Sequence, residues 1–267
     1  EVLVVSDYPV EYAPSKSVSF SLKNPLKIRN SIQKLRQIIH DYNPSIIHVH
    51  QANSYAFIAG KANDGSTPLV LTAWGSDVLL LPKRSIIHRW LVTQALRYAD
   101  IVTADSEQMI QEIHALCPDK EVVNANFGVD IDLPEAMNVE RELILYSNRM
   151  HEPLYRIEDI LKEFNALCKE SDGQLILAGK GSLTEKLKEY TKLHQLINHV
   201  TFTGFVTKTQ NKANYLKSKF FISIPTSDGT SISLLEAMAY GCIPVLSDLP
   251  ANREWVEDGK NGIIIGR

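Results

Sequence analysis

The sequence is short of cysteine, of long apolar runs and of excess charge, and each shortage excludes a class of protein. Its three cysteines, Cys117, Cys168 and Cys242, lie far apart and form no C-x-x-C pair. This spacing argues against a disulfide scaffold or a zinc site and favours reduced thiols. No apolar run approaches the roughly 18 residues that span a bilayer. No signal peptide precedes the first strand-like run, so we expect a cytoplasmic protein.

The charge balance excludes nucleic acid as the main partner. The 267 residues carry a formal net charge of -3, and neither half of the chain has an excess of basic residues. Hydrophobic residues make up 44% and charged residues 22%, which is ordinary for a globular protein. The length is enough for two domains.

Short β-branched runs alternate with helical patterns along the whole chain. The strands predicted in the first half lie at 2–6, 46–50, 69–72, 101–104 and 122–124. The strands predicted in the second half lie at 143–147, 175–178, 200–203, 220–224, 243–246 and 263–265. The predicted helices lie at 24–41, 53–63, 85–98, 106–116, 156–170, 182–197, 210–218 and 231–240.

This alternation predicts an α/β protein with two doubly wound domains. Strands that are apolar throughout, each followed by a helix, are typical of parallel sheets that are covered on both faces. We place the domains at 1–135 and 136–267, with a linker around 125–140 that contains Pro134.

The stretch 225–241 carries the most chemistry. A strand ends at Ile224, a polar turn follows, and a helix is expected to run from about Ser231 to Gly241. Ligands of such sheets bind beyond the carboxyl ends of the strands. The backbone N–H groups of Gly229, Thr230 and Ser231, together with the helix dipole, would suit a diphosphate.

Two carboxylates, Asp228 and Glu236, are placed to serve the same site. A carboxylate suits a ribose because it accepts hydrogen bonds from two neighbouring hydroxyls. The alternative is a capping Asp and a solvated helix Glu. Glu236 lies within the apolar run 234–239, however, where a lone carboxylate needs a partner.

The same stretch resembles the donor-binding motif of retaining glycosyltransferases of family four, which have the GT-B fold. Leu234-Leu-Glu-Ala-Met-Ala-Tyr-Gly241 matches the family run position by position, and Asp228 stands where the family has its first Glu. The resemblance implies two Rossmann-like domains that face a cleft. It places Glu236 at the ribose and Asp228 near the sugar.

Other motifs of the second half extend the resemblance to the donor side. Arg149 stands where the family has an arginine that contacts the diphosphate, and Arg156 either replaces the family lysine or simply opens the next helix. Gly179 and Gly181 resemble the Ala-Gly-x-Gly turn, whose small residues let the backbone approach the nucleotide. Phe205 lies in a segment that resembles the loop that holds the base through its main chain. A plain strand end is the alternative there.

In the first half, His48 and His50 alternate on one strand and therefore share one face. No cluster of further ligands is near in sequence, so we expect no metal. The resemblance places His50 at the reaction centre, and we expect His48 to be a core histidine with a hydrogen-bond partner. Trp74-Gly75-Ser76-Asp77 resembles a loop of many members, in which Gly75 permits a sharp turn. Asp77 either bonds acceptor hydroxyls or caps the backbone.

Three further features bear on the extent and setting of the protein. Asp130-Ile-Asp132 reads D-x-D, a metal motif of another glycosyltransferase fold, and we interpret it as coincidental. The basic residues of 23–36 and 83–97 form either solvated faces or a peripheral contact with a membrane. Family members have an additional βα unit at the start and additional helices at the end, so we expect both ends to be clipped.

The resemblance implies a metal-independent transferase without a cofactor. It would move a hexose-type sugar from a UDP- or GDP-sugar to a glycan or lipid-linked acceptor in surface polysaccharide biosynthesis. His50, Asp228 and Arg149 would be its catalytic residues. The alternatives are a non-catalytic fragment that binds a nucleotide-sugar and an epimerase that acts on the nucleotide-sugar alone.

Overall fold

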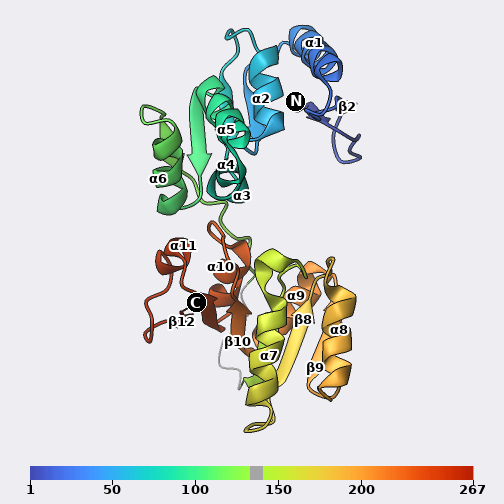
Figure 1. The fold of residues 1–267 in the computed structure, drawn as a ribbon, viewed down its shortest axis with the longest axis vertical. Coiled ribbons are helices and arrows are strands. Elements are labelled where there is room, and N and C mark those ends of the chain that lie inside the picture. Colours follow the sequence, from blue (N-terminus) through green and yellow to red (C-terminus); the bar gives the residue numbers. More distant parts are fainter. Residues whose placement is uncertain (133–140, 267) are drawn as a thin grey trace. The chain divides into compact units, whose positions relative to one another are not determined.

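A computed structural model describes residues 1–132 and 141–266. The chain divides into two compact units, Glu1–Asn126 and Phe127–Arg267, and each is described by itself (Figure 1). We predicted the boundary after residue 135, and the structure divides the chain earlier, after Asn126. Ile131 accordingly packs on the core of the second unit. Residues 133–140 of the predicted linker, which include Pro134, lie outside the described residues.

The first unit contains two parallel sheets in its described residues. One pairs β1 (Val4–Ser6) with β2 (Ser15–Ser17), and the other has the order β3-β4-β5-β6. The strands of the second sheet are β3 (Ile47–His50), β4 (Leu69–Thr72), β5 (Ile101–Ala104) and β6 (Val122–Asn124). The helices are α1 (Pro25–Tyr42), α2 (Ser54–Ala62), α3 (Ser76–Leu79), α4 (Leu81–Arg84), α5 (Ile86–Tyr98) and α6 (Glu107–Leu116).

The core of the first unit lies on one face of this second sheet. Val49, Leu69, Leu71 and Val102 point into a cluster that includes apolar residues of α1, α2, α5 and α6. The histidines that alternate with Val49 are exposed. Thr72 of β4, which is paired with His50 and lies on the same face, is buried.

The second unit has a parallel sheet in the order β12-β11-β10-β7-β8-β9. Its strands are β7 (Glu142–Ser147), β8 (Gln174–Ala178), β9 (Val200–Gly204), β10 (Ser218–Ser223), β11 (Ile243–Ser247) and β12 (Ile263–Ile265). The helical elements are η1 (Pro153–Tyr155), α7 (Ile157–Leu167), α8 (Thr184–Leu193), α9 (Lys208–Lys217), α10 (Ile232–Ala239) and α11 (Pro250–Arg253).

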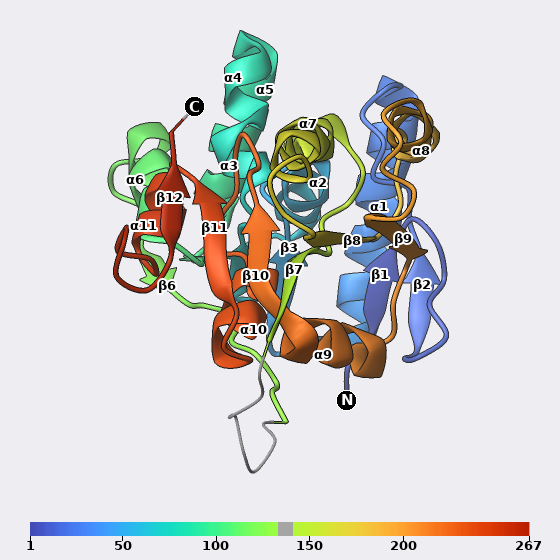
Figure 2. The ribbon, with the colours of Figure 1, turned by 90° about the horizontal axis from the view of Figure 1, so that it is seen from below.

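Both faces of this sheet are covered, as predicted. Figure 2 shows α7 and α8 on one side and α9 and α10 on the other. The side chains of β8 alternate accordingly: Leu175 and Leu177 join the cluster of α7 and α8, and Ile176 and Ala178 join that of α9 and α10. A strand that is buried on both sides explains the apolar run that the sequence shows.

Most predicted elements are present, with bounds that shift by a few residues at their ends. The elements that sequence reasoning missed are β2 and the short helices α3, α4, η1 and α11. β2 reads Ser-Lys-Ser and has no apolar pattern to reveal it. A four-residue helix is too short to show a periodicity.

Candidate functional site

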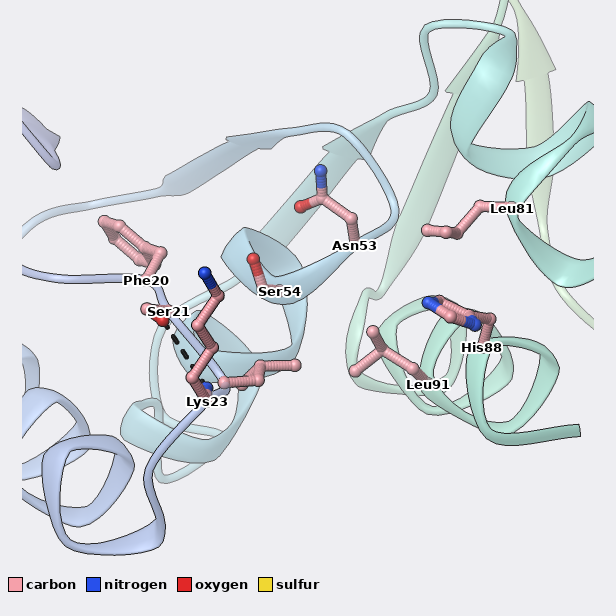
Figure 3. Close-up of a pocket in the computed structure, with 9 residues that line it drawn as sticks. Phe20, Ser21, Lys23, Asn53, Ser54, Leu81, His88 and Leu91 are labelled. Carbon is pink, nitrogen blue, oxygen red and sulfur yellow. Dashed lines mark hydrogen bonds between the residues drawn. The ribbon is translucent and has the colours of Figure 1, made fainter. Parts of the chain in front are cut away.

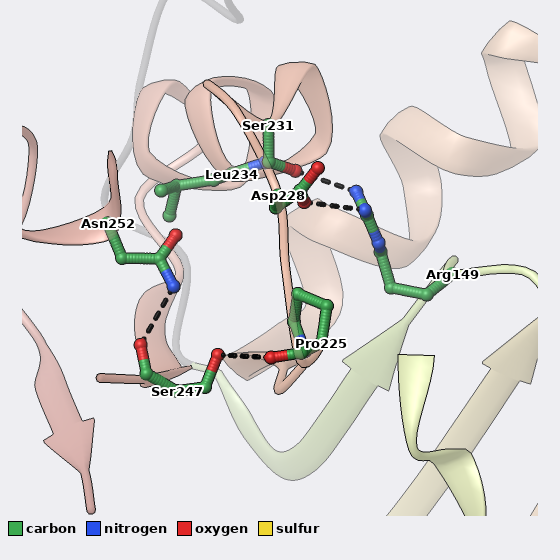
Figure 4. A network of polar contacts seen from close by, with 7 residues as sticks. All are labelled: Arg149, Pro225, Asp228, Ser231, Leu234, Ser247 and Asn252. Atoms are coloured by element: carbon green, nitrogen blue, oxygen red, sulfur yellow. Dashed lines mark hydrogen bonds and ion pairs between the residues drawn. The ribbon is translucent and has the colours of Figure 1, made fainter. Parts of the chain in front are cut away.

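The loop after β10 is fixed to its neighbours by hydrogen bonds. Figure 4 shows the hydroxyl of Ser247, which donates to the carbonyl of Pro225 at 2.9 Å. The amide of Asn252 donates to the carbonyl of Ser247 at 2.8 Å. The backbone N–H of Thr226 donates to the carbonyl of Leu154 at 2.9 Å. The loop that carries the predicted donor site therefore has a defined conformation.

Arg149 connects two residues of this loop. Its Nη2 lies 2.6 Å from Oδ2 of Asp228, and its Nη1 donates to Oγ of Ser231 at 2.8 Å (Figure 4). The guanidinium also lies over the ring of Tyr155, 4.4 Å from the centroid. The structure thus brings together three residues that the sequence predicted separately, from the end of β7 and the start of α10.

The ion pair is largely shielded from solvent. The side chain of Arg149 is 11% exposed and that of Asp228 is 22% exposed. Burial raises the pKa of Asp228, although Arg149 and the backbone of Gly229 oppose the shift. Desolvation therefore outweighs the favourable charge, which is common for a buried pair.

Helix α10 begins where the sequence predicted. Ser231 is its N-cap residue and accepts from the backbone N–H of Leu234 at 3.4 Å. The indole N–H of Trp255 donates to Oγ1 of Thr230 at 3.3 Å. A guanidinium and a helix N-terminus thus meet at one point, and both favour an anion.

Glu236 is half-buried, and two side chains donate hydrogen bonds to it, as we expected for a carboxylate within an apolar run. Its Oε2 accepts from Nδ2 of Asn211 at 3.1 Å and from the hydroxyl of Tyr215 at 3.0 Å. Sequence reasoning missed both partners. Asn211 and Tyr215 are four residues apart and therefore share a face of α9, but nothing in the sequence indicates which helix that face meets.

The glycines of the predicted turn have roles within the protein itself. Gly179 has φ +96°, and its N–H donates to the carbonyl of Gly204 at 2.7 Å. A Cβ on Gly181 would lie 2.4 Å from the carbonyl oxygen of His151. Packing alone therefore explains Gly181, and the approach to a nucleotide stays a prediction. Phe205, which follows β9, is 69% exposed, and its contact with the base stays a prediction.

Arg156 opens helix α7. It adopts a left-handed conformation with φ 53°, and its Nε lies 2.8 Å from Oδ2 of Asp159. This geometry favours the interpretation of Arg156 as the residue that starts a helix. A contact with the donor stays a prediction.

In the first unit, the predicted catalytic residue His50 is in contact with Trp74, which was predicted on the acceptor side. The indole N–H of Trp74 donates to Nδ1 of His50 at 3.2 Å, and the two rings meet edge to face with centroids 5.8 Å apart. His48 shares the face of His50, as predicted, with centroids 4.4 Å apart. His48 bonds Oγ1 of Thr72 at 2.7 Å, but it is exposed, so its prediction as a core histidine is wrong.

Asp77 caps the backbone of the loop. Its Oδ2 accepts from the N–H of Ala52 at 2.6 Å, and its Oδ1 accepts from the N–H of Trp74 at 3.0 Å. The residue is 4% exposed, and burial raises its pKa. Of the two predicted roles, this geometry supports capping. Gly75, with φ 99°, makes the sharp turn that was expected.

An open pocket of about 490 Å³ lies in the first unit between the loop before α1 and helices α2, α4 and α5 (Figure 3). Phe20, Leu81 and Leu91 supply apolar walls, and Lys23 and His88 supply polar groups. Asp7 ties the loop to α2, because its carboxylate accepts from the N–H of Phe20 and from the hydroxyl of Tyr55, both at 2.9 Å.

The Asp130-Ile-Asp132 sequence pairs with lysines. Asp130 lies 2.6 Å from the ammonium of Lys208, and Asp132 lies 2.6 Å from that of Lys212. In the part of the chain that the structure describes, no three His, Cys, Asp or Glu side chains are grouped to hold a metal. None of the described helices combines the length and the hydropathy needed to cross a bilayer.

Comparison with solved structures defines the class. Each unit is a Rossmann-like α/β domain, and the chain has the GT-B glycosyltransferase fold. Anabaena HepE in complex with UDP and glucose matches with a TM-score of 0.76 and 17% identity, over 95% of this chain and 72% of that one. Sucrose-phosphate synthase from Thermosynechococcus elongatus matches with a TM-score of 0.77 and 14% identity, over 96% and 72%.

The chain belongs to the family of glycosyl transferases group 1, which it matches over residues 132–267. Residues 6–106 match the glycosyl transferase 4-like family. The N-acetyl-alpha-D-glucosaminyl L-malate synthase of Bacillus anthracis is 24% identical over 86% of this chain and 64% of its own length. A phosphatidyl-myo-inositol mannosyltransferase of Mycobacterium leprae is 26% identical over 87% and 63%. The chain thus spans less than two thirds of these relatives.

Proposed function

We propose that the second unit binds a nucleotide-diphosphate sugar and that the protein transfers the sugar with retention of configuration. The observation that carries this proposal is the contact of Arg149 with both Asp228 and Ser231 at the start of α10, with Glu236 further along the same helix. The cation and the helix N-terminus would hold the diphosphate, and Glu236 would accept hydrogen bonds from the ribose.

The proposed chemistry depends on the leaving group. When the bond between the anomeric carbon and the diphosphate breaks, negative charge develops on the diphosphate oxygens. Arg149 bonds Ser231 at the N-terminus of α10, and in this proposal the guanidinium and the helix N-terminus stabilise the charge on the diphosphate and so lower the barrier. We propose that no metal is needed, and that Asp228 lies near the sugar.

We propose that the first unit supplies the acceptor side, with His50 and Trp74 near the reacting groups. The pocket between Lys23 and His88 would receive an acceptor that carries an acid group next to an apolar part. The relatives are named for malate and for phosphatidyl-myo-inositol, and both molecules carry acid groups. A lysine beside apolar walls suits that chemistry.

Nucleotide binding tests the donor site first. UDP, GDP and their sugar derivatives would be titrated by calorimetry and by thermal shift, which detects any ligand that binds the native state. We expect Glu236→Ala to remove the response. Glu163→Ala, an exposed glutamate on α7, is the matched control and should keep it. Equal responses of the two variants would contradict the proposal.

Product analysis then separates transfer from its alternatives. With the bound nucleotide-sugar and a panel of acidic acceptors, a transferase forms product only when an acceptor is present. An epimerase would convert the donor alone, and a non-catalytic protein would bind it without turnover. The anomeric configuration of the product, read by NMR, tests retention. Unchanged turnover in the presence of a chelator tests metal independence.

A specific surface favours peripheral contact with a membrane as well. Ile86, Ile87 and Trp90 of α5 are 86%, 74% and 53% exposed, and the basic residues Lys83 and Arg84 precede them. Exposed apolar side chains beside basic ones suit an anionic lipid surface. Lys83 also pairs with Glu112 at 2.7 Å, which leaves Arg84 as the other basic residue beside this apolar patch. On α1, Lys34 and Arg36 bond backbone carbonyls, so that predicted basic stripe is partly engaged as well.

Vesicle sedimentation tests the membrane contact. We expect the protein to pellet with vesicles that contain phosphatidylglycerol and to remain in solution with phosphatidylcholine alone, in a salt-dependent manner. Ile86→Glu with Ile87→Glu should abolish pelleting. Leu193→Glu, at a residue of α8 that is 78% exposed, should not. Pelleting of the double variant would count against this surface.

A further inference from the structure

Glu236 belongs to a hydrogen-bonded network that extends from β7 through α9 to α10. The hydroxyl of Tyr146 donates to Oδ1 of Asn211 at 2.6 Å, and Nδ2 of Asn148 contacts the same oxygen at 3.2 Å. The same Nδ2 donates to the hydroxyl of Tyr215 at 2.8 Å. Asn211 and Tyr215 then donate to Glu236.

The hydrogen bonds of this network run in one direction, from Tyr146 and Asn148 to Asn211 and Tyr215 and from there to the carboxylate. Tyr146 donates to the carbonyl oxygen of Asn211, which fixes the side-chain amide with its Nδ2 toward Glu236. Asn148 donates to the oxygen of Tyr215, which leaves the hydroxyl proton of Tyr215 for Glu236 or for the carbonyl of Ser233, 3.2 Å away. A carboxylate oxygen is the stronger acceptor of the two.

Both bonds reach a single oxygen of Glu236. Asn211 and Tyr215 contact Oε2, and each holds it from a different turn of α9. Two donors on one oxygen fix the rotation of the carboxylate and leave Oε1 to accept from a ligand. The side chains of Tyr146 and Tyr215 are fully buried, so the network has little freedom to rearrange.

The tyrosines act as donors over a wide pH range. Burial raises the pKa of Tyr146 to about 12, and burial together with the nearby Glu236 raises the pKa of Tyr215 further. Both phenols therefore keep their protons at neutral and moderately alkaline pH. The orientation of the carboxylate does not depend on a group that titrates near neutrality.

We propose that Asn211 and Tyr215 are positioning residues that hold Glu236 with Oε1 directed to the ribose hydroxyls of the donor. This inference rests on the proposed function, because it assumes that Glu236 contacts the ribose. It assigns different roles to the two oxygens of the carboxylate: Oε2 accepts from Asn211 and Tyr215, and Oε1 accepts from the ribose. It also assigns a role to α9, a helix that the donor motif does not include.

The ribose hydroxyls themselves provide the readout. The Kd values of UDP and GDP would be compared with those of their 2′,3′-dideoxy forms, which lack the hydroxyls. A hydrogen bond to a charged group contributes roughly 1.5–3 kcal/mol, so we expect the wild type to prefer the ribose form by about tenfold or more. Tyr215→Phe and Asn211→Ala should reduce this preference to a few-fold, and Glu236→Gln should do the same.

The controls separate positioning from stability. Tyr240 is buried, and its ring stacks on that of Tyr215 with centroids 5.7 Å apart. Tyr240→Phe makes the same chemical change in the same cluster and should keep the full preference. Tyr146→Phe, one step back in the network, should give an intermediate value. The melting temperature of each variant shows whether the fold is retained.

The outcomes distinguish this inference from the function that it assumes. A wild type that binds nucleotide without any preference for the ribose form would overturn the assignment of Glu236 and this inference together. A wild-type preference that Tyr215→Phe and Asn211→Ala both retain would overturn the positioning role alone. Equal losses in Tyr240→Phe and Tyr215→Phe would show a packing effect and would also overturn it.

Discussion

The indole N–H of Trp74 lies 3.2 Å from Nδ1 of His50, on a loop that Asp77 holds by two backbone hydrogen bonds. An indole N–H can only donate, so this contact requires Nδ1 of His50 to accept. The proton of the neutral imidazole then lies on Nε2. Trp74 thereby selects one tautomer of a histidine that the family resemblance places at the reaction centre.

We therefore predict that Trp74→Phe changes the protonation of His50. Partial desolvation of the His50 ring, which packs beside Trp74, and then the neighbouring His48 lower the pKa of His50 in the wild type. Nitrogen chemical shifts should show a single Nε2–H tautomer in the wild type and a mixture in the variant. Transfer should slow about tenfold, the range of a lost orienting hydrogen bond. A variant with wild-type shifts would show that the contact does not control the tautomer.

Arg149→Lys should weaken donor binding, although the substitution keeps the positive charge. The guanidinium reaches Asp228 and Ser231 with two different nitrogens, and an ammonium cannot reproduce this fork. We expect the nucleotide Kd to rise about tenfold or more, since one charged hydrogen bond contributes roughly 1.5–3 kcal/mol. Calorimetry measures the change. Lys162→Arg, an exposed cation on α7, is a control and should bind as the wild type does.

The donor side could be predicted further than the acceptor side, for a physical reason. Residues 225–241 combine a strand end, a turn and a helix start in one continuous stretch, so the sequence places Asp228, Ser231 and Glu236 by itself. The partners Asn211 and Tyr215 depend on how α9 packs against α10, which no local pattern encodes. The pairing of Trp74 with His50 likewise joins two strand ends, and only the register of β3 and β4 brings them together.

The buried His151 should make the stability of the second unit depend on pH. The residue is 1% exposed, its Nδ1 lies 3.0 Å from Oγ1 of Thr184, and burial and then Lys188 lower its pKa below the ordinary 6.5. In the unfolded chain this histidine binds a proton below about pH 6.5. In the folded protein it stays neutral to a lower pH, because its pKa is lowered. Stability should therefore fall as the pH drops below about 6.5.

Melting temperatures between pH 5 and 7.5 test this dependence. The curve of His151→Gln should be flatter than that of the wild type, because glutamine does not titrate. His194→Gln, at a histidine that ends α8, is the control and should keep the wild-type slope. Parallel curves for the wild type and His151→Gln would contradict the prediction.

Two glycines of the second unit should respond differently to alanine. At Gly181 a Cβ would lie 2.4 Å from the carbonyl oxygen of His151, so backbone must move to admit it. Gly259 has φ +75° and no atom within 4 Å of the new Cβ, so only conformational strain opposes the change. Overpacking costs roughly 1–3 kcal/mol, whereas strain of this kind costs about 1 kcal/mol.

Denaturant unfolding of Gly181→Ala and Gly259→Ala measures these costs. We expect Gly181→Ala to lose more stability and also to weaken nucleotide binding, because the shifted backbone of His151 lies two residues from Arg149. Gly259→Ala should bind nucleotide as the wild type does. If Gly181→Ala were as stable as the wild type but bound nucleotide poorly, packing would not explain this glycine. A direct approach of the nucleotide to the turn would then account for it.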